Sequence, residues 1–437
     1  MRCNLLSLLL LTSGVCMGVT PEEIRDEFSA TPGKSGGIYY AYPYDTDSIP
    51  PFPAGYEAVY ISHYGRHGSR WAINEKQYPY VADILEREHL RGNLTPTGVE
   101  VLDKVKTLWR DAEGHAGELS PLGQRQHKGI ARRMRERTPG LFADSARISA
   151  LSSTEPRCIV SMAAFCESLK EGNPALRIER AASPGDMSFI AYTTPEAKAF
   201  TAATSRFRKD VSDYRERTVK GERLLRLLFR ETPFQDSAPT KADWGEGNSE
   251  GVQFLKSLHD IAVTTQNLET DVDLLSIFTP EELYSFWLPL NYNMYVRHGN
   301  SPQGEQLGMK SARSLLDDII ERADKALTGG DLKVQLRFGH DSNLIRLLAL
   351  MGLDGMAESE ENPELYYSAW QDYRVSPMGA NLQLIFLQPE GIERKSDADD
   401  TLVLILHNER GATLPLLSPT APFYRWSDLK RFWQQGE

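Results

Sequence analysis

Strand patterns occur in the two outer parts of this chain and are separated by a long helical stretch, which limits the folds open to it. Short apolar runs typical of buried strands lie at residues 57–62, 147–151, 332–338, 381–387 and 402–406. Between Ser183 and Gly330 long charged helical patterns replace them, at 194–229, 249–268 and 307–327, and a further helical pattern lies at 284–295. This order predicts an α/β fold: a three-layer α/β/α core with a mostly parallel sheet, plus an inserted, mainly helical domain. We expect the core at residues 19–182 and 331–437 and the insertion at 183–330; a continuous helical layer of one domain is the alternative.

The balance of charge excludes one broad class of partner. The 437 residues include 49 Lys and Arg against 60 Asp and Glu, which gives a formal net charge of -11. General nucleic-acid binders bring excess positive charge to the phosphate backbone, so we expect no nucleic-acid partner. An anion that binds this chain must therefore meet a local basic pocket.

Residues 1–18 have the pattern of a signal peptide. Arg2 precedes an apolar run at residues 5–11, and small residues lead to a cleavage zone near Gly18. The run is too short to span a bilayer, and no later stretch is apolar enough, so we expect no membrane span. The expected product is secreted or periplasmic. Lipidation of Cys16 is the alternative, and Val15 disfavours it, since a small residue should precede a lipidated cysteine.

Cleavage would leave Cys158 and Cys166 as the remaining cysteines. They lie on the helix predicted at 155–169, where the helical rise separates them by about 12 Å. A disulfide needs Cα atoms within about 7 Å, so we expect two buried thiols.

A run of two arginines around one histidine directly follows the first predicted strand. It is Arg66-His67-Gly68-Ser69-Arg70, and ligands bind at the carboxyl ends of strands in open α/β sheets. Arginine forks match phosphate oxygens and stabilise a transferring phosphoryl group. A histidine between them can supply the nucleophile for covalent transfer. The run predicts a phosphate or carboxylate site; a basic surface turn is the alternative.

A second candidate set follows the strand predicted at 332–338. Gly339-His340-Asp341 stands where that strand ends and a helical pattern begins, and a helix N-terminus preceded by glycine binds anions readily. His340 can donate to a phosphate oxygen. Asp341 fits two roles, the N-cap of the helix or the general acid that protonates a leaving alkoxide.

Arg157 is the third candidate, in the first turn of the helix at 155–169. The helix dipole disfavours a cation there, which indicates an anionic partner, although a nearby Asp or Glu would serve. The three strand ends together carry three arginines, two histidines and one carboxylate. In a sheet they can converge on one edge.

Together these motifs resemble the histidine acid phosphatases, the second clade of the histidine phosphatase superfamily. That family includes phytases, multiple inositol polyphosphate phosphatases and prostatic-type acid phosphatases. The motifs occur in the family's order, as RHGSR, GELSPLGQRQH, STEPRCIVSMAAF, GHD and LHNERGATLPL. The resemblance spans about residues 57–416 and is dense at these motifs.

The resemblance implies a role for each of six residues. His67 would form a phosphohistidine, and Asp341 would donate a proton to the leaving group. The phosphate would be held by the remaining four, which are Arg66, Arg70, Arg157 and His340. The multiple inositol polyphosphate phosphatases commonly have His-Ala-Glu where this chain has His340-Asp341-Ser342, so the chain departs from the pattern of that branch. The usual disulfides of the family cannot form with two cysteines.

The other histidines are interpreted as structural. His63 and His67 have the spacing of two zinc ligands on a helix, but the glycines of the run oppose a helix there. We therefore expect no metal site, and a structural hydrogen bond from His63. Arg297-His298-Gly299 repeats the tripeptide at the end of a helical pattern and is interpreted as a helix C-terminus. The rest are expected to be supporting or surface groups (His127, His407) or to face solvent (His89, His115, His259).

The sequence thus predicts a secreted, metal-independent hydrolase of phosphomonoesters without a cofactor, with a small-molecule substrate such as phytate. Since Asp341 must be protonated to donate, we expect an acidic optimum. A phosphoglycerate-mutase-like phosphotransferase and a non-catalytic polyanion-binding protein are the alternatives. Substrate specificity would come from the helical insertion and the turn after RHGSR, with Lys76, Arg206, Arg208 and Lys209 as candidates.

Overall fold

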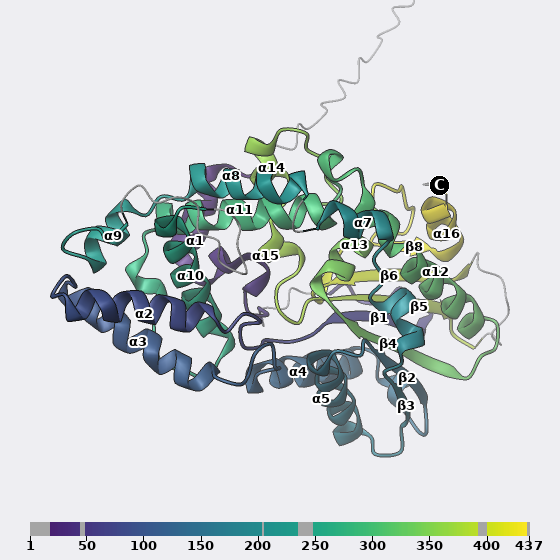
Figure 1. The fold of residues 1–437 in the computed structure, drawn as a ribbon. Helices are drawn as coiled ribbons and strands as arrows, with labels where there is room; N and C mark the ends of the chain where they lie inside the picture. The colour runs from purple at the N-terminus through teal and green to yellow at the C-terminus, as the bar shows by residue number, and fades with distance from the viewer. Residues whose placement is uncertain (1–17, 44–48, 203–204, 235–247, 392–399, 435–437) are drawn as a thin grey trace, which may run out of the picture.

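The computed structural model describes residues 18–43, 49–202, 205–234, 248–391 and 400–434, which form an eight-stranded sheet flanked by helices (Figure 1). The strand order is β3-β2-β4-β1-β5-β6-β7, and β8 pairs with β6. The strands are β1 (Tyr56–Arg66), β2 (Arg147–Ser152), β3 (Arg177–Ala181), β4 (Leu332–Gly339), β5 (Asn381–Pro389), β6 (Leu402–His407), β7 (Arg410–Gly411) and β8 (Phe423–Arg425).

The strands run parallel on one side of the sheet and antiparallel on the other. β3, β2, β4 and β1 are parallel neighbours, whereas β5 pairs antiparallel with both β1 and β6. The three strands that lead into the sequence motifs belong to the parallel side; they are β1, β2 and β4. They therefore end at the same edge.

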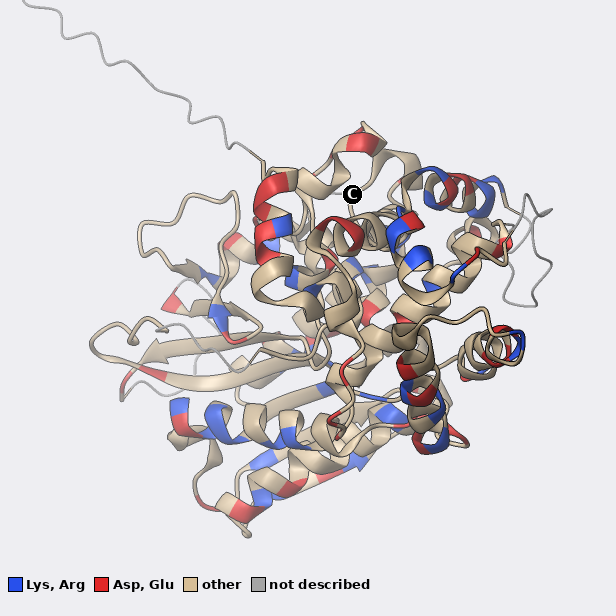
Figure 2. Ribbon diagram, turned by 90° about the vertical axis from the view of Figure 1, so that its left-hand side faces the viewer, with Lys and Arg blue, Asp and Glu red and all other residues tan. Residues whose placement is uncertain are grey.

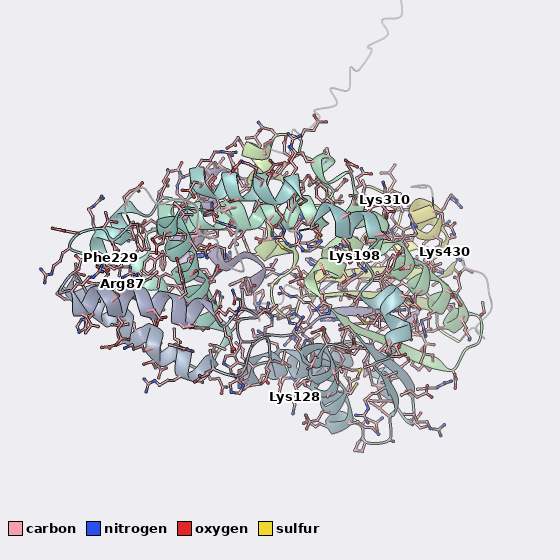
Figure 3. All side chains as sticks on the ribbon, viewed as in Figure 1. Arg87, Lys128, Lys198, Phe229, Lys310 and Lys430 are labelled. Carbon is pink, nitrogen blue, oxygen red and sulfur yellow. The ribbon has the colours of Figure 1, made fainter. Side chains whose placement is uncertain are left out.

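Helices cover both faces of the sheet and confirm the predicted α/β class. α4 (Pro121–Arg137) and α5 (Pro156–Gly172) cover one face; α12 (Leu307–Leu327), α13 (Asp341–Met351) and α16 (Trp426–Gln434) cover the other. Side chains alternate between the faces, so Ile61 packs with α4 and α5 while Tyr60 packs with α12 and α13. Lys128 on α4 and Lys430 on α16 lie on the outside of the molecule (Figure 3).

A layer of helices adjoins the edge where the motif-bearing strands end. Its helices are α1 (Pro21–Ala30), α2 (Gln77–Leu90), α3 (Pro96–Ala112), α9 (Glu222–Leu228), α10 (Glu250–Thr264) and α11 (Pro280–His298). They share one apolar core, in which Leu85 and Val105 join Leu228 and Phe254. Helices from both sides of residue 182 therefore bury one another's apolar faces. The domain boundaries at 182 and 330 stay a prediction.

Shorter elements connect these layers. They are η1 (Pro32–Tyr39), η2 (Pro139–Phe142), η3 (Pro184–Asp186), α6 (Met187–Ile190), α7 (Pro195–Phe200), α8 (Arg206–Thr218), η4 (Thr265–Asn267), η5 (Leu275–Ile277), η6 (Pro302–Gly304), η7 (Pro363–Leu365), α14 (Tyr366–Ala369) and α15 (Asp372–Val375). Blue and red segments intermingle along the outer helices (Figure 2).

Three local details differ from the sequence patterns. β1 continues through Arg66 instead of ending at Ser62, because Gly65 pairs with both β4 and β5. β3 was not predicted, since it is an edge strand whose side chains are mostly exposed and charged. The helical pattern at 194–229 divides into α7, α8 and α9.

The predicted signal peptide lies outside the described residues up to residue 17. Within the described ranges, no helix is both long enough and apolar enough to cross a bilayer.

Candidate active site

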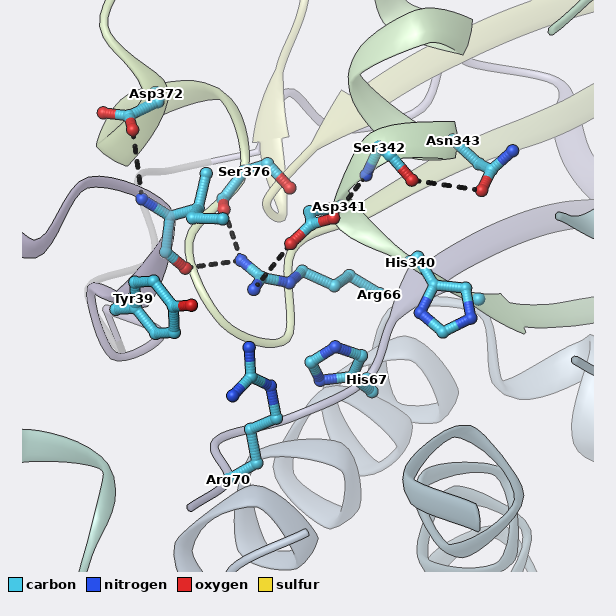
Figure 4. Close-up of polar contacts among 12 residues, drawn as sticks. Tyr39, Arg66, His67, Arg70, His340, Asp341, Ser342, Asn343, Asp372 and Ser376 are labelled. Atoms are coloured by element: carbon cyan, nitrogen blue, oxygen red, sulfur yellow. Dashed lines mark hydrogen bonds and ion pairs between the residues drawn. The ribbon is translucent and has the colours of Figure 1, made fainter. Parts of the chain in front are cut away.

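Two parallel neighbours in the sheet bring the two strongest motifs together. β1 and β4 pair as far as Arg66 and Gly339, so His67 and His340 follow them side by side. The centroids of the two imidazole rings lie 5.9 Å apart. Figure 4 shows five of the six predicted side chains around one space: Arg66, His67, Arg70, His340 and Asp341.

Both helices on one face of the sheet hold the turn after β1. The amide of Gly68 donates to Ser161 Oγ on α5 at 3.2 Å, and the amide of Ser69 donates to Gln126 Oε1 on α4 at 2.8 Å. A Cβ on Gly68 would lie 2.5 Å from the carbonyl oxygen of Gly123, so α4 leaves no room for a side chain there. The glycine of the motif is therefore required by close packing.

The hydrogen bond of His67 fixes its tautomer. Nδ1 lies 3.0 Å from the carbonyl oxygen of Gly68, and because a carbonyl only accepts, Nδ1 carries the proton and Nε2 keeps its lone pair. Burial lowers the pKa of His67 well below its usual value, and the positive charges of Arg66 and Arg70 lower it further. The neutral ring thus has a nitrogen that can attack phosphorus.

The guanidinium of Arg66 is fully buried, and its Nη1 atom already donates two hydrogen bonds within the protein. Nη1 donates to the carbonyl oxygens of Ile38 at 2.5 Å and Ser376 at 2.7 Å, while Nη2 pairs with Asp341 Oδ2 at 3.0 Å. Nε has no hydrogen-bond partner among the described residues. Burial lowers the pKa of Arg66 to about 10, so the group stays charged in acid and neutral solution. The Nε–Nη2 edge is the one that can bind a phosphate bidentately.

Asp341 faces this arginine from the first turn of α13. His340 is the N-cap of that helix and Asp341 follows it, so the interpretation of Asp341 as the cap is wrong. Its Oδ1 accepts from the amide of Ser342 at 2.6 Å. Burial raises the pKa of the Asp341 carboxyl, but the charges of Arg66 and His340 outweigh it and hold that pKa below its usual value. The carboxylate can exchange a proton with a group bound at Arg66.

Arg70 and His340 bound the same space from two sides. The guanidinium of Arg70 lies over the ring of Tyr39, 5.1 Å from its centroid, and its Nε has no partner among the described residues. His340 Nε2 lies 3.2 Å from Ser153 Oγ. Burial lowers the pKa of His340 to about 4, which leaves a neutral ring that can donate one hydrogen bond.

Arg157 reaches the group from the start of α5. Its Nη1 pairs with Glu155 at 3.0 Å, and its charge lowers the pKa of both Arg66 and His340. Glu155 is thus the nearby carboxylate that the sequence analysis gave as the alternative partner of Arg157. All six predicted residues come together in the structure.

Three further arginines, which we call the distal arginines, interact through their charges with Asp341 or with one another: Arg208, Arg297 and Arg346. Burial lowers the pKa of Arg297, at the end of α11, and the charge of Arg208 lowers it further while that of Asp341 raises it. Burial likewise lowers the pKa of Arg346 on α13 to about 10, with Arg297 adding to the effect and Asp341 opposing it. The Nε of Arg297 is buried without a partner among the described residues. Three guanidinium groups against one carboxylate favour an additional anion near them.

One of the four specificity candidates lies near this site. Arg208 lines a cavity of about 540 Å³ that reaches Tyr39. The other three are exposed: Lys76, Arg206 and Lys209. Sequence reasoning missed Arg297, although it lies in the second Arg-His-Gly, because its approach to Asp341 depends on how α11 packs.

Two histidines differ from their predicted settings. His259 is buried, because its neighbours Lys256 and Asp260 pair with each other at 2.6 Å and leave the ring to stack on Phe286. The structural hydrogen bond expected of His63 is wrong: neither ring nitrogen has a partner among the described residues. Its ring packs on aromatic side chains, and burial lowers its pKa to about 3.

The expected settings of four other histidines, of one helix end and of both cysteines are confirmed. His89 and His115 are exposed, α11 ends at His298 with Gly299 as its C-cap, and both cysteines are buried free thiols. His127 and His407 are buried supporting groups, and His407 Nε2 contacts the carbonyl oxygen of Val375 at 2.7 Å. The described part of the chain holds no group of three His, Cys, Asp or Glu side chains that could bind a metal ion.

Comparison with known proteins identifies the family of this chain. The family model of the histidine phosphatase superfamily (branch 2) matches residues 65–408. The chain is 26% identical over 391 residues to multiple inositol polyphosphate phosphatase 1 of Gallus gallus, covering 84% of this chain and 80% of that protein.

Two solved structures share the fold. The multiple inositol polyphosphate phosphatase of Bifidobacterium longum, in complex with inositol hexasulfate, has a TM-score of 0.72 at 18% identity, covering 91% of this chain and 97% of that one. The phytase from D. castellii has a TM-score of 0.66 at 15% identity, covering 92% and 84%. Since the family model extends over most of the sequence, from the end of β1 to the end of β6, this chain belongs to branch 2 of the histidine phosphatase superfamily.

Proposed function

We propose that this protein is an acid phosphatase that hydrolyses phosphomonoesters through a phosphohistidine at His67, with inositol polyphosphates as its substrate class. The observation that carries the proposal is the neutral His67, with Nε2 unprotonated, between the buried guanidinium groups of Arg66 and Arg70. A phosphate held there would present its phosphorus to Nε2. The arginines would stabilise the charge that develops on its oxygens.

The reaction takes two steps. In the first, Nε2 of His67 forms a bond to phosphorus while the ester oxygen leaves, and Asp341 gives that oxygen its proton. In the second, water attacks the phosphohistidine, Asp341 takes a proton from the water, and inorganic phosphate leaves. Asp341 and the ring return to their starting states, so the reaction needs no further reactant.

The polyphosphate part of the proposal rests on the distal arginines. Arg297 and Arg346 interact with the charge of Asp341, the proposed proton donor to the leaving group, and Arg208 interacts with Arg297, so a second phosphate on the leaving group would meet Arg297 and Arg208. A relative in Gallus gallus is named a multiple inositol polyphosphate phosphatase, and a structure with the same fold holds inositol hexasulfate. The proposal includes export from the cytoplasm, which the N-terminal pattern of the sequence supports.

The first test compares phosphate release from phytate and from an aryl phosphate at pH 5 with EDTA, using the mature protein and His67→Ala. We expect the wild type to release phosphate from both and the variant from neither. Phosphoryl transfer to phosphoglycerate instead of water would favour the mutase alternative. Tight binding of phytate without release would favour the binding protein.

The substrate class is tested with a matched pair on α8. Arg208→Ala should lower kcat/KM for phytate by about tenfold and leave the aryl phosphate unaffected, as expected for loss of one charged contact. Arg206→Ala is the control, because the side chain of Arg206 is 93% exposed. Equal effects of Arg208→Ala on both substrates would contradict the assignment of Arg208 to a second phosphate.

A further inference from the structure

The orientation of Arg66 depends on two backbone carbonyls from distant parts of the chain. Ile38, in η1, and Ser376, after α15, both accept from Nη1. With Nη1 occupied, the planar guanidinium can rotate little, and its Nε–Nη2 edge faces the site. Whatever fixes these carbonyls therefore fixes the phosphate-binding edge.

Asp372 contacts both residues that carry these carbonyls, Ile38 through its side chain and Ser376 through its main chain. Its side chain is fully buried, and Oδ2 accepts from the amide of Ile38 at 3.3 Å, so the backbone of one residue, Ile38, links this carboxylate to Arg66 (Figure 4). The main-chain carbonyl of Asp372 accepts from the amide of Ser376 at 2.8 Å, which is the C-cap bond of α15 and does not depend on the side chain. On its far side, Oδ1 accepts from Trp287 Nε1 at 2.8 Å.

The chain next to Ile38 is shaped to receive this carboxylate. Gly37 has a φ of +57°, and a Cβ there would lie 2.2 Å from Asp372 Oδ2. Two separate reasons, the backbone angle and the space, thus require glycine beside the carboxylate. Because the fit is close, either an added Cβ at Gly37 or an amide in place of the Asp372 carboxylate should displace the backbone of Ile38.

We propose that the carboxylate of Asp372 is a positioning group, which holds Arg66 in its phosphate-binding orientation through the backbone of Ile38. This inference deepens the proposed function and rests on it, since Arg66 is taken as a phosphate ligand. Asp372 touches neither the phosphate nor His67. Its effect passes through Arg66 alone.

The surroundings of Asp372 let its charge change within the working range of an acid phosphatase. Burial raises the pKa of Asp372 to about 6, although the hydrogen bonds from Trp287 and Ile38 and the charge of Arg66 lower it. Of the elements packed against it, β1 contributes the charged Arg66, and α11 contributes the uncharged Trp287 and Asn291. On η1 the nearest cation, Lys34, pairs with Glu27 at 2.8 Å.

The test is Asp372→Asn, measured by calorimetric binding of inorganic phosphate at pH 7.5. Both carboxylate oxygens accept from N–H groups, so an amide must turn its own NH₂ toward one of these donors. We expect the Kd for phosphate to rise about tenfold, and kcat/KM for an aryl phosphate to fall by a similar factor. Gly37→Ala should have the same effect although it leaves the carboxylate in place.

Phe28→Leu is the matched control for lost stability. Phe28 packs on Trp287 and Tyr373 with ring centroids 5.6 Å and 5.7 Å away, in the same core but without a hydrogen bond to the carboxylate. It should lower the melting temperature and keep the Kd for phosphate within twofold. A Kd that is unchanged in Asp372→Asn, or that rises equally in Phe28→Leu, would overturn the positioning role.

A pH profile separates positioning by charge from packing. The ratio of Kd values between Asp372→Asn and wild type should shrink from about tenfold at pH 7.5 toward one at pH 4.5, where the wild-type carboxyl is itself neutral. The ionisation of phosphate is common to both proteins and cancels in the ratio. A ratio independent of pH would refute the inference. Because binding requires no turnover, a wild type that binds phosphate but hydrolyses nothing would reject the proposed function alone.

Discussion

The burial of His259 predicts that the protein loses stability as the solution becomes acidic. The ring is 1% exposed, stacks on Phe286 with centroids 4.9 Å apart, and lies 3.2 Å from Ser35 Oγ. Burial lowers its pKa from 6.5 to about 4. The unfolded chain binds a proton at this residue below pH 6.5, whereas the folded chain binds it only below about pH 4. Stability present above pH 6.5 is therefore lost as the pH falls through this range.

The size of the loss follows from the two pKa values. At about 1.4 kcal/mol per pKa unit, the difference between 6.5 and about 4 makes a free-energy change of about 3 kcal/mol between pH 7 and pH 4. Glutamine at this position does not titrate and can still hydrogen-bond Ser35. The wild type should thus lose about 3 kcal/mol more than His259→Gln over the same interval.

The assay is urea unfolding at pH 7 and pH 4, followed by tryptophan fluorescence in both proteins. At pH 7 the variant should be the less stable, because it loses the stack on Phe286, and at pH 4 that deficit should shrink or reverse. His89→Gln, at an exposed position on α2, is the control for replacing any histidine. If the free-energy gap between wild type and His259→Gln is the same at both pH values, the assignment of a buried neutral imidazole is refuted.

Three further predictions concern the site and the elements that hold it. Asp341→Asn should lower kcat by about 100-fold or more for alkyl phosphates and much less for aryl phosphates, whose leaving groups need less protonation; equal losses in steady-state kinetics would refute the general-acid role. Gly123→Ala should abolish activity, because its Cβ would lie 2.2 Å from the carbonyl oxygen of Ser69; a thermal melt and an activity assay within twofold of wild type would contradict the packing. Glu409→Gln should cost about 3 kcal/mol or more of unfolding free energy, since the buried carboxylate is the partner of Arg133, and a urea titration that shows less than 1 kcal/mol would exclude that role.

The six site residues could be predicted because each lies at the end of a parallel strand or in the turn and first helical residues that follow it. Chain order and strand position alone bring Arg66 and His340 to one edge, and short motifs there carry enough chemistry to identify a phosphate site. The same reasoning could not find Asp372, which acts through a backbone contact with a segment 334 residues earlier in the chain. Nothing in the sequence near Asp372 indicates that contact.

Two errors in the sequence interpretation concern the burial of polar segments. His259 has charged neighbours and was expected to face solvent, but Lys256 and Asp260 neutralise each other on one side of α10. β3 was missed for the opposite reason, since an edge strand with exposed charges lacks the apolar pattern of a buried one. Local patterns record polarity, whereas burial depends on which partner each polar group finds.

Arg66 connects the phosphate site to the protonation state of the proposed acid. In the free protein the carboxylate of Asp341 pairs with Arg66, and the surrounding positive charges hold the pKa of that carboxyl below its usual value. A phosphate dianion bound to Arg66 and Arg70 would offset these charges and repel the carboxylate, and both effects raise the pKa of Asp341. Substrate binding would thus promote the proton uptake that the first step requires. Once the phosphate leaves, the ion pair with Arg66 re-forms and favours the ionised carboxylate, so the charge of the substrate sets the proton cycle of the site.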